Sequence, residues 1–176
     1  MHLVDLTMEA LRERGYDHLV TVANLETEGL RAEFAADPAL NVTSACREGE
    51  GIAIASGLVA GGRRTVLCME NLGLFECLDT LRGMPTAMGI PLPIFVGYLG
   101  RGMSMEQMQE AHGGLAENTM TAYQWTEPVL SGAGIPYRVV LPTTPEDEAR
   151  EALAEALDTE GPFVILVDHF FRIDDD

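Results

Sequence analysis

Two glutamates at the start of an apolar segment are the first residues of this chain that could do chemistry. Glu48 and Glu50 alternate with glycines in the stretch REGEG (47–51), and the apolar run IAIASGLVA follows. A carboxylate at a helix N-terminus is favoured by the macrodipole, so an ordinary solvated helix start is one interpretation. The small apolar residues that follow instead predict a buried helix start, where desolvation raises the pKa of a carboxyl group. Such a carboxyl could hold or share a proton at neutral pH.

A second polar motif stands where the strand-like run RTVLCM (64–69) ends. The chain there reads MENLGL (69–74), with Asn71 and Gly73 at its centre. Asn71 is a good N-cap residue for the helix-like sequence that follows. We expect it both to cap that helix and to form part of a pocket wall.

Asn24 and Leu25 follow another strand-like run, HLVTVA (18–23). A capping box, in which Asn24 and Thr27 or Glu26 satisfy helix N–H groups, is the favoured interpretation of this motif. Because the motif follows a strand, we also expect it to line the same edge of the molecule as Asn71.

The segment 99–125 is rich in Met, Gly and polar residues and has no clean period. A long irregular stretch in a compact domain is usually functional or mobile, and its methionines could equally be soft packing at a subunit contact. The segment contains His112, which is either an ordinary loop histidine or a group that binds a carboxylate or transfers a proton. Arg101, between two glycines, could meet an anionic substrate or simply lie on the surface.

The elements that must position these residues alternate along the chain. Strand-like runs without polar alternation, typical of strands covered on both faces, alternate with helix-like stretches. The sequence therefore predicts one α/β domain over residues 1–176, with three layers (α/β/α) and a mostly parallel sheet. Ligands of such sheets bind at the carboxyl ends of the strands. The expected strands are 18–23, 64–69, 92–98, 137–141, 163–168 and, more weakly, 40–45; the expected helices are 26–37, 48–60, 73–89 and 144–161.

The stretch EGEGIAIASGLVAGGRRTVLCMENLGLFECLDTL (48–81) resembles the pyrimidine-binding domain of thiamine diphosphate enzymes. The likeness is strongest to the two-subunit 2-oxoacid decarboxylases, the sulfopyruvate and phosphonopyruvate decarboxylase group. PIFVGYLGRG (93–102), QEAHG (109–113) and GIPYRVVL (134–141) follow in the expected order, so the resemblance covers most of the chain. It departs at Glu70, where the group usually has Gln, and at Leu72, where it usually has Ser.

The resemblance implies roles for particular residues. Glu48, separated by two residues from the Gly51-Ile52-Ala53 run, matches the glutamate that hydrogen-bonds N1′ of the cofactor's aminopyrimidine and is therefore the expected catalytic carboxyl, whereas Glu50 is expected to be structural or solvated. His112 is the second catalytic candidate. The residues expected to bind the cofactor are Glu48, Asn71, Gly73, Asn24 and Leu25.

The chain lacks the Gly-Asp-Gly motif with which thiamine diphosphate enzymes hold Mg²⁺ and the diphosphate. The resemblance thus implies an α subunit that needs a separate β subunit carrying that motif and the Mg²⁺, in a hetero-oligomer, with a homodimer as the alternative when isolated. The implied reaction is the decarboxylation of a small anionic 2-oxo acid, sulfopyruvate or phosphonopyruvate. The alternative is a non-catalytic structural or regulatory homologue, which the altered ENLGLFE loop (70–76) favours and Glu48 opposes.

Composition excludes other classes of partner. The chain has 28 acidic and 11 basic residues, a formal net charge of −17 and no Lys, so nucleic acid and anionic membranes are unfavourable partners. This acidity suits a high-salt cytoplasm, although a GC-rich genome would also favour Arg over Lys. No apolar run is long enough to span a bilayer, and a cytoplasmic protein is the default expectation.

Cys46, Cys68 and Cys77 have no metal-site spacing and are expected to be buried structural thiols.

Overall fold

The structure is a computed structural model that describes residues 2–168, with residues 1 and 169–176 outside the described part. Six parallel strands form one sheet in the order β2-β1-β3-β4-β6-β5. All six strands that the sequence predicts are present, including the weak one. They are β1 (His18–Thr21), β2 (Asn41–Ser44), β3 (Thr65–Glu70), β4 (Leu92–Gly97), β5 (Tyr137–Val140) and β6 (Pro162–Val167).

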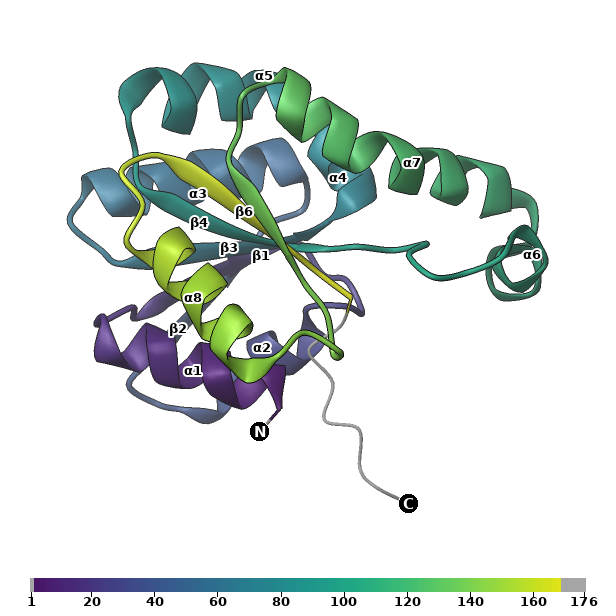
Figure 1. The fold of residues 1–176 in the computed structure, drawn as a ribbon. Helices are drawn as coiled ribbons and strands as arrows, with labels where there is room; N and C mark the ends of the chain where they lie inside the picture. Colours follow the sequence, from purple (N-terminus) through teal and green to yellow (C-terminus); the bar gives the residue numbers. More distant parts are fainter. Residues whose placement is uncertain (1, 169–176) are drawn as a thin grey trace.

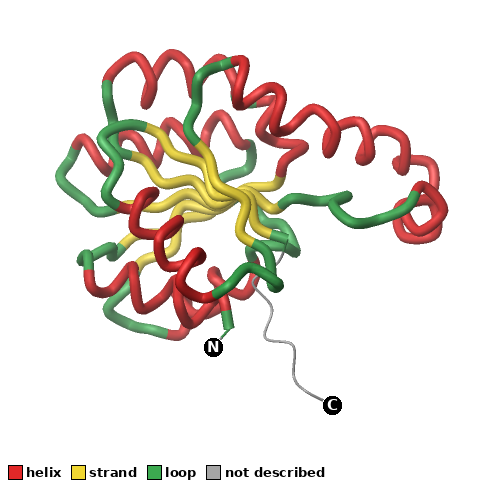
Figure 2. Tube along the Cα trace, in the orientation of Figure 1, coloured by secondary structure: helices red, strands yellow, loops and turns green. Residues whose placement is uncertain are grey.

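Helices cover both faces of this sheet (Figures 1 and 2). One face carries α1 (Leu3–Glu13), α2 (Glu28–Ala36) and α8 (Glu146–Leu157), and the other carries α3 (Glu48–Ala60), α4 (Asn71–Glu76), α5 (Leu78–Leu81) and α7 (Ala116–Gly132). A π-helical turn, η1 (Arg82–Thr86), follows α5 and contains Pro85, so the segment expected as one helix, 73–89, is divided into α4, α5 and this turn. The predicted three-layer α/β fold is confirmed. No helix within residues 2–168 is long and apolar enough to cross a membrane.

Burial on both faces explains why the strands read as continuous apolar runs. In β3, Val66 and Cys68 pack in the core under α1, α2 and α8, whereas Leu67 and Met69 pack in the core under α3, α5 and α7. Successive side chains of a strand point to opposite faces, so both halves of such a strand must be apolar when both faces are covered.

The segment 99–125, expected to be irregular, is largely helical. It contains α6 (Met105–His112), a 3-10 turn η2 (Gly113–Leu115) and the first part of α7. Ser104 starts α6 with a capping box, in which its side chain accepts from Gln107 N at 3.2 Å and Gln107 Oε1 accepts from Ser104 N at 2.8 Å. Figure 1 shows α6 packed on the end of α7 that projects beyond the sheet. Because these turns bury little, the apolar periodicity that marks a packed helix is absent.

The topology fixes where a ligand would bind. The chain leaves β1 to form β2 on one side of it and later returns to form β3 on the other side. In parallel α/β sheets the crevice at the carboxyl ends of strands on either side of such a reversal is the usual ligand site. The loop after β1, the start of α3 and the end of β3 all reach this crevice.

Candidate active site

Glu48 is the first residue of α3, and its side chain lies against the backbone of Gly73 in α4. A Cβ atom placed on Gly73 would be 2.1 Å from Glu48 Oε1 and 2.2 Å from Glu48 Cδ. Only glycine therefore permits the observed position of this carboxyl group. Glu48 and Gly49 are half-buried and the helix becomes buried at Gly51, so the predicted burial of the helix start is only partial at Glu48.

Glu76 and Glu50, rather than Glu48, accept the hydrogen bonds from groups around the start of α3. Glu76, at the end of α4, accepts hydrogen bonds from Gly49 N at 2.9 Å and Arg47 Nη2 at 2.6 Å. Glu50 is exposed and accepts from Cys46 N at 2.8 Å, in keeping with the structural role expected for it. Within residues 2–168 the carboxyl group of Glu48 accepts no hydrogen bond, which leaves its oxygens available to a ligand.

Two further carboxyl groups stand beside Glu48. Glu70 ends β3, and burial, followed by the charges of Glu26 and Glu48, raises its pKa to about 7. Glu26 lies over Gly97 at the end of β4, because a Cβ on Gly97 would be 2.6 Å from Glu26 Cβ. Gly97 is the register partner of Glu70 on the neighbouring strand. Three carboxyl groups from separate elements thus face the same crevice, and desolvation together with mutual repulsion favours the protonated form of the central one.

The sequence alone indicates no chemical role for Glu26 or Glu70. In the sequence, Glu70 stands out only as a departure from a family pattern and Glu26 only as a possible member of a capping box. The alternation of side chains along β3 could have indicated that Glu70 is desolvated. Glu70 lies on the same face of β3 as Val66 and Cys68, which is the face that α2 covers. A glutamate at the carboxyl end of a strand otherwise wholly buried is desolvated by its position.

Asn71 does not cap α4, so that prediction is wrong. Glu70 occupies the N-cap position, no side chain bonds to the helix start, and Asn71 is the first helical residue. Its side chain is fully buried and donates from Nδ2 to Leu99 O at 3.1 Å. Asn71 Oδ1 is buried and has no hydrogen-bond partner in the described part of the chain. Asn71 therefore joins α4 to the loop after β4.

The capping box expected in the loop after β1 is wrong: α2 begins at Glu28, and no side chain bonds to the start of this helix at its N-cap Thr27. Asn24 Oδ1 accepts from Thr27 N at 2.9 Å and from Thr27 Oγ1 at 3.0 Å, while Asn24 Nδ2 donates to Val22 O at 2.9 Å. These bonds occupy the Asn24 side chain within its own loop. The adjacent Leu25 side chain is 73% exposed, which is unusual for a large apolar residue and places it at the open side of the crevice.

A hollow of about 340 Å³ adjoins this crevice. It is lined by Leu25, Glu26, Leu99, Gly100, Arg101, Met103 and Asp168. His112 is not part of this lining; it is half-buried at the end of α6, which packs on α7. The described structure of the single chain thus does not bring His112 together with Glu48.

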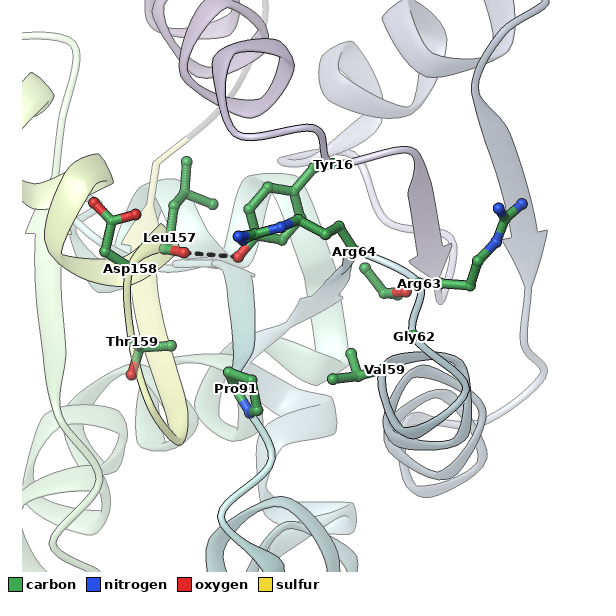
Figure 3. A pocket seen from close by; sticks show the side chains of 10 residues that line it. Tyr16, Val59, Gly62, Arg63, Arg64, Pro91, Leu157, Asp158 and Thr159 are labelled. Atoms are coloured by element: carbon green, nitrogen blue, oxygen red, sulfur yellow. Dashed lines mark hydrogen bonds between the residues drawn. The ribbon is translucent and has the colours of Figure 1, made fainter.

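A second cavity, of about 400 Å³, lies at the opposite edge of the sheet, where β3 begins (Figure 3). Its wall includes Arg64, whose guanidinium carbon is 5.3 Å from the centre of the Tyr16 ring. Tyr16 donates from its hydroxyl to Leu157 O at 2.8 Å. The amino ends of the strands are not where parallel sheets bind their ligands, so we assign no function to this cavity.

Two of the three cysteines are buried as expected. Burial raises the pKa of the Cys68 thiol to about 12, and burial together with the nearby Glu48 and Glu76 does the same for Cys77. Cys46 is exposed in the loop before α3, so the expectation of a buried thiol is wrong there. Among residues 2–168 there is no group of three or more His, Cys, Asp or Glu side chains that could hold a metal ion.

Comparison with known proteins gives this site a chemical context. No protein-family model matches the chain. It is 28% identical to sulfopyruvate decarboxylase subunit alpha of Methanococcus maripaludis, over 97% of both chains. It is 27% identical to the subunit of that name from Methanothermobacter thermautotrophicus, over 90% of both chains. The chain is a homologue of sulfopyruvate decarboxylase alpha subunits.

Solved structures with the same fold are longer decarboxylases. Benzoylformate decarboxylase from Polynucleobacter necessarius matches 99% of this chain with a TM-score of 0.66 and 20% identity. The thiamine diphosphate-dependent 4-hydroxybenzoylformate decarboxylase of Rhodococcus jostii matches 95% with a TM-score of 0.63 and 17% identity. The chain spans 32% and 30% of these two chains, so it corresponds to about one third of each. At this identity the match concerns the fold, which is that of thiamine diphosphate enzyme domains.

Proposed function

We propose that this chain, as a single domain over residues 1–176, is the pyrimidine-binding α subunit of a thiamine diphosphate-dependent 2-oxo acid decarboxylase. The observation that carries the proposal is the carboxyl group of Glu48. It is held against Gly73 at the ligand-binding edge of the sheet, while Glu76 accepts from the helical Gly49 N and Glu50 accepts from Cys46 N in the loop before the helix. A carboxyl placed at such an edge without a structural partner is suited to a ligand.

The residues present fit the pyrimidine half of the cofactor. When bound, thiamine diphosphate would supply the group that stabilises the electron pair left behind when CO₂ departs. Glu48 would hold a proton on its carboxyl group and share it with the ring nitrogen N1′, and Gly73 keeps that carboxyl in place. Glu70, half-buried between Glu26 and Glu48, would carry a second proton close to neutral pH. The proposed roles of Asn71, Asn24 and Leu25 are to shape the wall beside this carboxyl.

The residues present do not fit the diphosphate half. Its Mg²⁺ needs several oxygen ligands, and residues 2–168 offer no suitable cluster. A partner chain with a Gly-Asp-Gly motif would hold Mg²⁺ and the diphosphate, and the site would form between the two subunits. The name subunit alpha in both full-length relatives supports this assembly. His112, on the projecting α6, would reach the reacting centre only in that complex.

The proposed substrate is a small anionic 2-oxo acid, sulfopyruvate converted to sulfoacetaldehyde and CO₂, or phosphonopyruvate decarboxylated in the same way. The names of the relatives support sulfopyruvate.

Calorimetry of thiamine diphosphate with Mg²⁺ tests this proposal, using the chain alone and then its co-expressed complex with a neighbouring chain that carries the Gly-Asp-Gly motif. We expect binding and CO₂ release only in the complex. Glu48→Gln should lower kcat by at least about hundredfold, because it removes the proton-sharing group. Glu50→Gln, two residues away on the same helix, is the matched control and should retain activity. A complex that assembles but binds no cofactor would instead favour the non-catalytic homologue.

A further inference from the structure

Among the described residues, the wall of the hollow beside Glu26 is mainly apolar, with two carboxylates, Glu26 and Asp168, and one cationic side chain. Leu25, Leu99 and Met103 provide the apolar surface, and Arg101 is the cation. Arg101 lies between Gly100, with φ of +94°, and Gly102, with φ of +74°. Both glycines adopt the left-handed backbone conformation, which turns the chain sharply on each side of Arg101. These two turns set the position of Arg101 in the loop after β4.

Arg101 has no acidic partner in residues 2–168, which is unusual in so acidic a protein. Eight other arginines form ion pairs with Asp or Glu: Arg12, Arg14, Arg31, Arg47, Arg63, Arg82, Arg138 and Arg150. The guanidinium carbon of Arg101 is instead 5.8 Å from the centre of the Tyr98 ring. A guanidinium held over an aromatic ring keeps its N–H donors directed to a further acceptor, and its charge is not cancelled.

The hollow is electrostatically coupled to the candidate active site through carboxyl groups. Glu26 lines the hollow, interacts electrostatically with Glu70, and Glu70 in turn interacts with Glu48. An anionic group that entered here would be repelled by Glu26 and by Asp168, the two carboxylates of the lining. It would be attracted towards Arg101, so Arg101 is the described group of this lining that favours binding of an anion.

We propose that Arg101 binds the terminal oxyanion of the substrate, a sulfonate, phosphonate or carboxylate group, while Leu25, Leu99 and Met103 surround the carbon that carries it. The inference rests on the function proposed above and makes Arg101 the residue that selects 2-oxo acids with an anionic tail. The guanidinium fork presents paired donors that match all three oxyanions.

The test is substrate selection by the co-expressed complex. CO₂ release is measured with sulfopyruvate, phosphonopyruvate and 2-oxosuccinate, whose tails are anionic, and with pyruvate and 2-oxobutanoate, whose tails are neutral. Arg101→Gln should raise KM for the anionic-tail substrates about tenfold to hundredfold, with little change for the neutral ones. Arg101→Lys, which keeps the charge, should recover part of the loss. Comparison of the three oxyanions identifies which one the site takes.

Arg64→Gln is the matched control. Arg64 also lies over a tyrosine ring and forms no ion pair within residues 2–168, although its charge helps to lower the pKa of Asp158; both residues line the cavity at the opposite edge (Figure 3). The Arg64→Gln variant should leave the selectivity between anionic-tail and neutral-tail substrates unchanged. Equal effects of Arg64→Gln and Arg101→Gln, or a ratio of anionic to neutral substrates unchanged by Arg101→Gln, would overturn the inference about Arg101 while the decarboxylase function stands.

Absence of CO₂ release from every 2-oxo acid by the unmodified complex would contradict the proposed function itself. A binding measurement on the chain alone then decides the role of Arg101. We expect titration with 3-sulfopropanoate, which lacks the keto group, to shift the Arg101 Nε–Hε NMR signal more than that of Arg64. Equal or absent shifts at the two signals would refute anion binding by Arg101.

Discussion

The carboxyl group of Glu48 rests on the backbone of Gly73, where a single Cβ atom would come within 2.1 Å of Glu48 Oε1. The first residue of α3 and the third residue of α4 are thereby joined by a contact that depends on the absence of a side chain. Glycine at position 73 is thus explained by Glu48, because as a helical residue it would otherwise favour alanine.

Gly73→Ala should displace Glu48 and reproduce the loss of activity of Glu48→Gln. A catalytic group misplaced by about 1 Å costs about hundredfold in rate, and we expect at least that loss in CO₂ release by the complex. Gly57→Ala on α3 is the control, because a Cβ there meets nothing within 4 Å. It should stabilise the chain by about 0.5–1 kcal/mol and leave activity intact. An active Gly73→Ala variant would argue against Glu48 as the reacting carboxyl.

The pH dependence of stability should reveal Glu70. Its pKa is raised to about 7 in the folded chain from an ordinary value near 4.5. The folded state therefore holds more protons than the unfolded state between these values, and stability falls as pH rises through this window. Glu70→Gln, which stays neutral, should be more stable than the unmodified chain at pH 8 by about 1–2 kcal/mol, allowing for solvent screening of a half-buried group. The difference should shrink towards pH 5.

Urea unfolding at pH 5, 6, 7 and 8 measures this effect. Glu148→Gln, at an exposed position in the first turn of α8, is the control and should show no rise in relative stability over the same range. If Glu70→Gln had the same stability difference at every pH, the carboxyl of Glu70 would not be titrating in this window.

The fold was predictable from the sequence because strands of a parallel sheet that is covered on both faces appear as continuous apolar runs. The run TVLCM in β3 is apolar on both faces, and this predicts a strand. The pattern fails for α6, where only Met108 is buried along the helix, so no apolar stripe marks it. Its capping box, Ser104 with Gln107, was a local signal that could have indicated the helix start.

The candidate site was predictable only in part. Glu48 followed from a motif, but its contact with Gly73 is between elements separated by a whole strand, and no spacing along the chain reveals such a contact. The same holds for Glu26 over Gly97. Asn71 was expected to cap its own helix because local rules consider only neighbouring backbone, whereas its actual acceptor is Leu99 O, 28 residues away.

Asn71→Ala should destabilise the chain, because it leaves the Leu99 carbonyl without its donor in a part-buried position. The expected loss in the free energy of unfolding is about 1–3 kcal/mol. Asn118→Ala, at an exposed position of α7, is the control and should change stability by no more than about 0.5 kcal/mol. Urea unfolding of both variants measures the difference. An Asn71→Ala variant as stable as the control would mean that this buried bond contributes little.

The three thiols should differ sharply in reactivity. Cys46 is exposed, whereas burial raises the pKa values of Cys68 and Cys77 to about 12, so thiolate is scarce at both buried positions. In native protein at pH 8, a chromogenic disulfide reagent should therefore modify one thiol rapidly, and unfolding should release the other two. Cys46→Ser should abolish the rapid phase and leave the slow phases unchanged. A rapid phase that persists in Cys46→Ser would mean that one of the buried thiols becomes accessible through local opening near α3, where Cys77 lies close to Glu48.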